Sequence, residues 1–137
     1  MCRPFDNQDF MRIRLETDAY YLILDKIQKK FYELIASPVH FREIQDISDV
    51  EEKYQLLYLL NNFSKNPVHD LKKTMNRTEE LILLNFGVAD AAHIAFAEQT
   101  ADVFISCDDK LLKKCKKNGI KIKTMNPIEF CNEEELR

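Results

Sequence analysis

The sequence contains few of the residues that interrupt regular structure. It has only two glycines, four prolines and no tryptophan in 137 residues. Because glycine and proline end helices and shape turns, their scarcity argues against an all-β or loop-rich protein and favours long helices. Long apolar runs are absent too, since none approaches the roughly 20 residues that a membrane-spanning helix needs. The sequence therefore predicts a helix-rich protein with no membrane segment.

Cysteine is scarce, and its spacing excludes the common metal and redox motifs. The four cysteines are Cys2, Cys107, Cys115 and Cys131, and no two of them have C-x-x-C spacing. Neither a zinc knuckle nor a thioredoxin-like site is therefore expected. Because no signal peptide opens the chain, we expect a cytoplasmic protein whose cysteines are reduced.

The composition is that of a globular chain rather than of a general nucleic-acid binder. Hydrophobic residues make up 45% and charged residues 31%, and the net charge is −3 at pH 7. A net negative charge does not favour phosphate binding over the whole surface. We expect a single domain over residues 1–137, long enough to bury about two-thirds of its unfolded surface.

Helical and extended segments alternate along the chain. Apolar periodicity predicts long helices at residues 9–31, 48–62 and 69–86. In the first of these helices, the charged residues, which include Arg12 and Glu16, lie mostly off the apolar stripe. Short apolar runs predict strands at residues 34–36, 103–105 and 120–122. Strands that alternate with helices favour an α/β fold with a parallel sheet.

Capping residues mark several helix ends. Ser37 is expected to cap a short helix that has Pro38 at its first position. Ser48 and Glu51 have the spacing of a capping box, and Gly87 is expected to end the helix before it.

Residues 88–114 carry the main functional signal. Asp90 opens an alanine-rich helical pattern, and the apolar run 103–105 reads as a strand buried on both faces. Asp108 and Asp109 follow that strand at its carboxyl end, where ligands bind in open α/β sheets. Carboxylates gathered there would suit a hard cation such as Mg²⁺ or Mn²⁺. The alternative for Asp90 and Asp108 is helix capping, which aspartate also favours.

The same residues resemble a known family. The patterns A-D-A-A-H-I-A-F-A-E and A-D-V-F-I-S-C-D-D-K-L-L, which contain Asp90 and Asp108, resemble the PIN-domain superfamily of metal-dependent ribonucleases. Many members of that superfamily are the toxins of toxin–antitoxin pairs. The resemblance implies a three-layer α/β/α sandwich with a short parallel sheet.

The resemblance extends along most of the chain. The segments R-P-F-D-N-Q near the start and N-P-I-E-F near the end look typical of one subgroup, and S-P-V-H-F-R-E-I supplies Glu43 as a further acidic residue. By this resemblance Glu43, Asp90 and Asp108 are catalytic. The same three residues, with Asp109 beside them, are the implied ligands of Mg²⁺ or Mn²⁺, and we expect them to converge on one ion.

One part of the family pattern has no match. In the subgroup, a first strand ending in aspartate lies just ahead of the Arg-Pro-Phe-Asp segment, and here the chain begins within that segment. Asp6 belongs to the segment itself and would be displaced from the strand end. The interpretation is therefore that the first strand and its aspartate are missing, because either translation starts further upstream or this is a degenerate member.

Several polar residues near the acidic set allow two interpretations. The lysines after Asp108 are either a solvated helix face or a phosphate-contacting patch, with Lys110, Lys113, Lys114 and Lys117 as the predicted nucleic-acid-binding residues. His93 and His40 are either packed structural residues or groups that act in acid–base chemistry or metal binding. Ser106 is a candidate to orient a metal-bound water.

Two functions follow from these observations. The first is a metal-dependent endoribonuclease of PIN type that hydrolyses RNA phosphodiester bonds and is impaired by the missing acidic residue. The alternative is a catalytically inactive PIN scaffold that binds RNA or a protein partner. The expected partners are RNA, a cognate antitoxin protein and a second copy of the chain, because the apolar segment 54–63 suits a homodimer interface.

Overall fold

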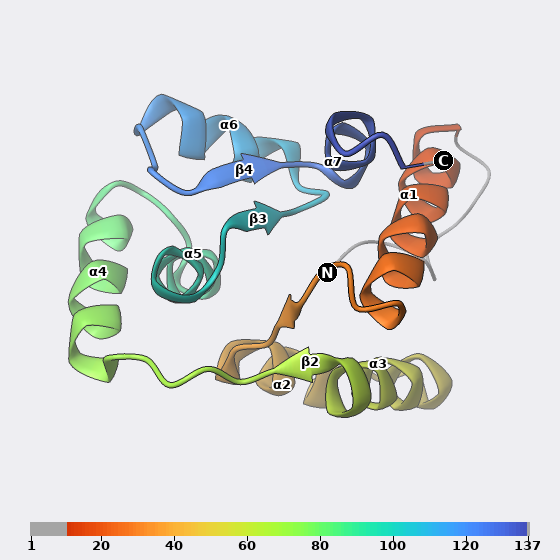
Figure 1. Ribbon diagram of the computed structural model, residues 1–137. Helices are drawn as coiled ribbons and strands as arrows, with labels where there is room; N and C mark the ends of the chain where they lie inside the picture. The colour runs from red at the N-terminus through yellow and green to blue at the C-terminus, as the bar shows by residue number, and fades with distance from the viewer. Residues whose placement is uncertain (1–10, 137) are drawn as a thin grey trace. The chain divides into compact units, whose positions relative to one another are not determined.

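The computed structural model describes residues 11–136, which form seven α-helices and four strands of two or three residues (Figure 1). In chain order these are α1 (Met11–Gln28), β1 (Leu34–Ile35), α2 (Pro38–Gln45), α3 (Val50–Phe63), β2 (Ser64–Lys65), α4 (Leu71–Leu83), α5 (Val88–Thr100), β3 (Val103–Ile105), α6 (Asp109–Lys117), β4 (Lys123–Met125) and α7 (Pro127–Glu133). None of these helices is both long enough and apolar enough to span a bilayer.

The predicted three-layer α/β/α sandwich of PIN type is wrong. The described residues form two separate parallel pairs, β1 with β2 and β3 with β4, instead of one sheet. The predicted central strand, Val103–Ile105, exists, but it is only half-buried and pairs on one side with β4. Strands this short offer too little surface to separate two layers of helices, so the helices pack mainly on one another.

The chain divides into two compact units. Unit 2 is the continuous segment Glu33–Asp102, and unit 1 combines the described residues before it with those after it. The expectation of a single domain over residues 1–137 stays a prediction. Each unit is described by itself below.

Unit 1 contains α1, the β3–β4 pair, α6 and α7. Helix α1 packs against α7, where the Cys131 thiol donates to the Ala19 carbonyl at 3.6 Å. The Tyr32 ring meets the edge of Phe130, with 5.3 Å between the ring centroids. Helix α6 packs on β4 and buries one face, which consists of Leu111, Leu112 and Cys115.

Unit 2 contains β1 and β2 together with α2 to α5. Its hydrophobic core beside the β1–β2 pair consists of Ala36, Ile44, Leu56 and Leu60. Helices α4 and α5 pack side by side, and Leu81 and Ile94 are completely buried there. Arg77 of α4 also donates from Nε to Glu98 of α5 at 3.0 Å. The two helices are therefore joined by apolar packing and by an ion pair.

The helix ends confirm some of the predicted caps and correct others. Ser37 caps α2 and Pro38 is its first residue, as predicted. The cap of α3 is Asp49, whose side chain accepts from the Glu52 amide, and not Ser48. Gly87 does not end α4. It is instead the residue before α5, with an ordinary φ of −63°.

The last strand also lies beyond its predicted position. Residues 120–122 do not form a strand, and β4 begins at Lys123 instead. Gly119 takes a left-handed φ of 62° just after α6. The Ile120 amide then donates back to the Cys115 carbonyl at 3.1 Å, so that the chain still closes the helix end at this point.

Candidate functional site

Helices α2 and α5 of unit 2 place Glu43 beside His93. The His93 Nε2 and a Glu43 carboxylate oxygen are hydrogen-bonded. The His93 side chain is 13% exposed, whereas that of Glu43 is 54% exposed, so the pair has one largely buried and one solvent-facing member. A predicted catalytic carboxylate is therefore held in position by a histidine from another helix.

His40 extends this pair into a small polar cluster. Its ring lies against that of His93, with 4.4 Å between the centroids. The Ser37 amide donates to the Nδ1 of His40 at 3.0 Å, so this nitrogen is an acceptor and the ring is neutral. Burial, together with the nearby His93, lowers the pKa of His40 from 6.5 to about 3. His40 therefore takes the place of the glutamate that usually completes a capping box.

Asp90 lies in the first turn of α5, three residues before His93. Side chains at this spacing are neighbours on a helix surface, so Asp90 belongs to the helix face that meets Glu43. The capping interpretation of Asp90 is wrong, because α5 begins at Val88 and Gly87 is the residue at its cap position. An anion in the first turn is nevertheless favoured by the helix dipole.

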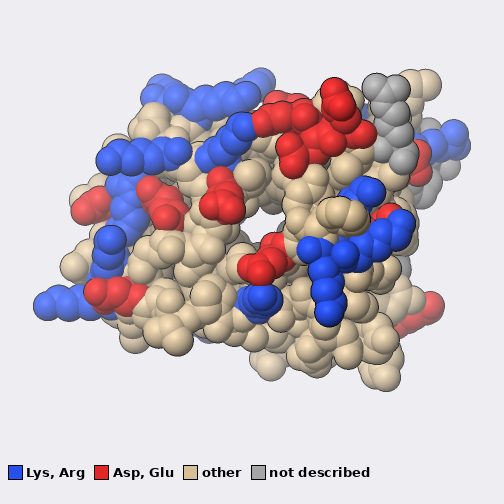
Figure 2. Space-filling model, in the orientation of Figure 1, with Lys and Arg blue, Asp and Glu red and all other residues tan. Residues whose placement is uncertain are grey.

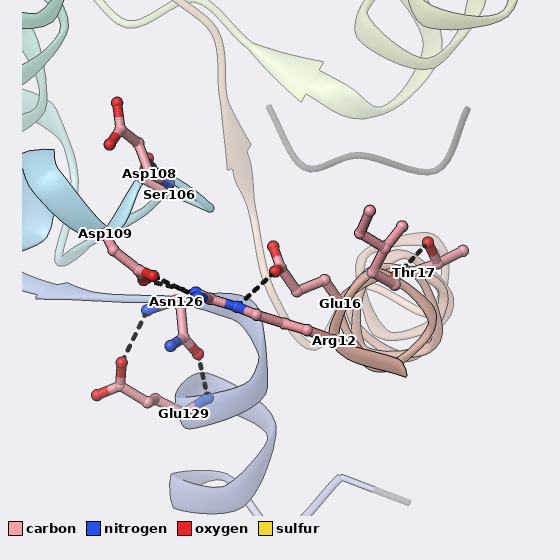
Figure 3. Close-up of polar contacts among 9 residues, drawn as sticks. Arg12, Glu16, Thr17, Ser106, Asp108, Asp109, Asn126 and Glu129 are labelled. Carbon is pink, nitrogen blue, oxygen red and sulfur yellow. Dashed lines mark hydrogen bonds and ion pairs between the residues drawn. The ribbon is translucent and has the colours of Figure 1, made fainter. Parts of the chain in front are cut away.

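Asp108 is the N-cap of α6 in unit 1. One of its carboxylate oxygens accepts from the amides of Lys110 at 3.0 Å and Leu111 at 3.2 Å (Figure 3). Its own amide donates to the Ser106 hydroxyl at 3.1 Å. The capping interpretation of Asp108 is thus confirmed. Its predicted role as a ligand, and that of Ser106 in orienting a water, stay predictions.

Asp109 is bound by Arg12, a residue that the sequence analysis did not predict to be part of a site. The Arg12 guanidinium donates through two nitrogens to both carboxylate oxygens of Asp109 (Figure 3). The same guanidinium donates from Nε to Glu16 at 3.0 Å. The hydrogen bond to Asp109 is the main reason that the pKa of Arg12 is raised above its usual value. A cation at Asp109 would have to displace Arg12.

Glu16 and Arg12 are the polar residues that sequence analysis missed. Their four-residue spacing is that of an i,i+4 pair on a helix, which was a usable signal for the contact between them. The burial of Glu16 had a signal as well. Glu16 is three residues after Ile13 and four before Tyr20, which places it on the apolar face of the helix, and its side chain is only 1% exposed.

The lysines that follow Asp108 lie mostly on α6 and face solvent. Figure 2 shows basic side chains gathered over the edge of the molecule where Figure 1 places α6. Lys110, Lys113 and Lys117 are exposed, and Lys114 is partly buried. Lys123 is paired with Glu133. These lysines are thus open to solvent, and their role in nucleic-acid binding stays a prediction.

The predicted ligands fall into both units. Glu43 and Asp90 belong to unit 2, and Asp108 and Asp109 belong to unit 1. Within residues 11–136, no three His, Cys, Asp or Glu side chains are grouped so that they could hold a metal ion together. Convergence of Glu43, Asp90 and Asp108 on one ion stays a prediction.

Comparison of the chain with protein-family models, curated proteins and solved structures gave no match. The PIN-domain resemblance therefore rests on the sequence patterns alone and stays a prediction.

Proposed function

We propose that the chain is a metal-dependent endoribonuclease that cleaves RNA by the carboxylate chemistry of PIN domains. Its cleavage requires Glu43, Asp90 and Asp108. The observation that carries the proposal is the position of Glu43 in unit 2, where it is bonded to His93 one helical turn from Asp90. Two acids that are 47 positions apart in the sequence thus belong to one pair of contacting helices.

The side chains in this region offer the type of ligand atom, carboxylate oxygen, that a hard divalent cation prefers. Mg²⁺ and Mn²⁺ take oxygen ligands, and Mg²⁺ needs only one or two protein carboxylates because it keeps several waters. When bound, such a cation lowers the pKa of a water and neutralises charge on the phosphate. Glu43 and Asp90 would supply the carboxylates that hold it.

His93 acts on this site through Glu43. Its hydrogen bond fixes one oxygen of a carboxylate that is otherwise half in solvent. Ligands held by outer partners bind cations better than freely rotating ones. The packed ring of His40 in turn limits the movement of His93. The cluster therefore orients Glu43 before a cation arrives.

The lysines of α6 supply the substrate-binding part of the proposal. Exposed lysines contact phosphates without reading base identity, so they hold RNA by its backbone. We place this activity in the cytoplasm, with a cognate antitoxin as the protein that would restrain it.

The test is cleavage of a labelled single-stranded RNA in Mg²⁺ or Mn²⁺ by Asp90→Asn and Asp70→Asn variants. Loss of an outer-shell partner typically costs 10–100-fold, so loss of the ligand Asp90 should reduce cleavage by at least about 100-fold. Asp70 caps α4 through the Lys73 amide, and asparagine caps equally well, so Asp70→Asn should match the parent chain. Equal activity of the two variants would refute the assignment of Asp90.

The second candidate is a catalytically inactive scaffold that binds RNA or a protein. It is favoured by the engagement of Asp109 with Arg12 and of Asp108 with the start of α6, which leaves these acids in structural contacts. An inactive scaffold would bind RNA with the same affinity in EDTA and in Mn²⁺, and it would show no cleavage that depends on Asp90.

A further inference from the structure

Glu16 is the most deeply buried acidic side chain in the described part of the chain. It projects from α1 of unit 1 and is 1% exposed. Its Oε1 accepts from Arg12, whereas its Oε2 is buried without a hydrogen-bond partner among residues 11–136. A buried carboxylate oxygen without a partner is costly, because water no longer solvates it. The side chain therefore has an unused coordination position.

A single arginine, Arg12, bridges the Glu16 carboxylate and a second carboxylate, that of Asp109. Figure 3 shows Glu16 extending from α1 toward the Arg12 guanidinium, whose other nitrogens bind Asp109 at the start of α6. Two carboxylates share one guanidinium, so these three side chains together carry a formal charge of −1. Arg12 itself is 51% exposed and can leave toward solvent without crossing the core.

We propose that Glu16 and Asp109 form a divalent-cation site that Arg12 occupies in the cation-free chain. A hard cation such as Mn²⁺ or Mg²⁺ would bind both carboxylates, fill its remaining positions with water and release Arg12. This two-carboxylate site lies in unit 1. It needs neither Glu43 nor Asp90, so it does not depend on the ribonuclease proposal.

Release of Arg12 gives the site a second property. A guanidinium that leaves a carboxylate keeps its charge and its planar set of donors, which suit phosphate oxygens. The cation would thus exchange a carboxylate-bound arginine for one that is available to an anion. Cation binding and release of the Arg12 side chain would thus be coupled.

The chain offers a matched control in Arg77. This arginine also bridges two glutamates, donating to Glu98 at 3.0 Å and to Glu80 at 2.9 Å. The difference lies in the carboxylate that it holds. Both oxygens of Glu98 accept from Arg77, whereas Glu16 keeps one buried oxygen without a described partner. Only the Arg12 bridge should therefore conceal a cation site.

The experiment is calorimetric titration of Mn²⁺ into the full chain and its variants. Arg12→Met should bind Mn²⁺ at least about tenfold more tightly than the parent chain, because a unit positive charge is removed from beside both ligands. Arg77→Met should bind as the parent does. The gain should persist in Arg12→Met/Asp90→Asn, which separates this site from the acids of unit 2.

Loss of a ligand should remove the gain. Arg12→Met/Glu16→Gln should return to the parent affinity, with circular dichroism used to verify that the fold is kept. Arg12→Met/Asp109→Asn gives the same test at a side chain that is 44% exposed, where folding is less sensitive. A gain that survives both ligand substitutions, or that Arg77→Met shows equally, would overturn the proposal. Absence of RNA cleavage would leave it intact.

Discussion

His40 fills a position that glutamate or glutamine normally occupies. At the third position of α2 its ring accepts the Ser37 amide, which it can do only while Nδ1 is unprotonated. In the unfolded chain the same ring titrates near pH 6.5, whereas in the fold the pKa of His40 falls to about 3. One side chain thus ties the stability of α2 to pH.

The sign of this linkage follows from the lowered pKa. Above pH 6.5 His40 is neutral in both states, and its contribution to folding is fully present. Between pH 6.5 and about 3 the unfolded chain gains a proton that the folded chain does not, so stability falls as the pH falls. This single group should cost roughly 1.4 kcal/mol per pH unit in that window.

His40→Gln isolates the effect. Glutamine completes a capping box and does not titrate, so this variant should keep α2 and lose the histidine-dependent slope. Urea unfolding of both proteins at pH 7.5, 5.5 and 4.5 measures the difference. Parallel loss of stability in the two proteins across this range would show that His40 is not responsible.

At the residue scale, local sequence predicted some of the helix caps and not others. Ser37 and Asp108 cap their helices as expected, because a cap depends on a few neighbouring amides. The contact of Glu43 depends on a helix that is distant in sequence, so its pairing with His93 had no local signal. Glu16 is different, because its partner Arg12 is four residues away on the same helix.

Helix α6 joins a structural role and a proposed functional role in one residue. The Asp108 side chain satisfies two amides at the start of the helix, so Asp108→Ala should lower the free energy of unfolding by about 1 kcal/mol. Asp108→Asn should cost only a few tenths of that value while removing the charge. Chemical denaturation of both variants tests the cap, and an equal loss of stability would contradict it.

The exposed face of α6 gives a second prediction. Lys113 and Lys117 lie on that face, so Lys113→Gln/Lys117→Gln should weaken RNA binding and make its salt dependence shallower by up to about two counterions. Lys72→Gln/Lys73→Gln on α4 removes the same charge elsewhere. Fluorescence anisotropy at several salt concentrations compares them. Equal effects would mean that only net charge matters.

The residues at which helices and strands begin were the hardest to predict from the sequence. Asp49 caps α3 instead of Ser48. Each of these two residues can serve as a cap and each is followed by a glutamate three residues later, so the spacing did not distinguish them. The strand expected at residues 120–122 is instead found at residues 123–125. The turn after Gly119 stays bonded to the end of α6, and the register with β3 begins only at Lys123.

At the scale of the whole molecule, α3 leaves an apolar surface stripe. Val50, Tyr54 and Tyr58 are four residues apart, and they are 80%, 71% and 58% exposed. Such a stripe is suited to a second copy of the same helix. We expect self-association that Tyr54→Glu/Tyr58→Glu reduces and that Tyr21→Glu on α1 does not. Sedimentation equilibrium measures this, and an unchanged mass in the first variant would remove α3 as the interface.

The fold class could not be obtained from the pattern of elements. Alternating helices and strands were identified, and parallel pairing was correctly expected. The size of the sheet was not, because strands of two or three residues have too little sequence to indicate which neighbours they pair with. An alternating pattern therefore predicted the direction of pairing but not the extent of the sheet.

Unit 1 is built from two segments that are far apart in the chain, and this affects the order in which contacts can form during synthesis. Helix α1 packs against α7, yet about 100 residues of chain separate the two helices. At 5–20 residues per second, a ribosome releases α7 roughly 5–20 s after α1. During that interval unit 2 can complete its own contacts, while α1 still lacks α7 to pack against.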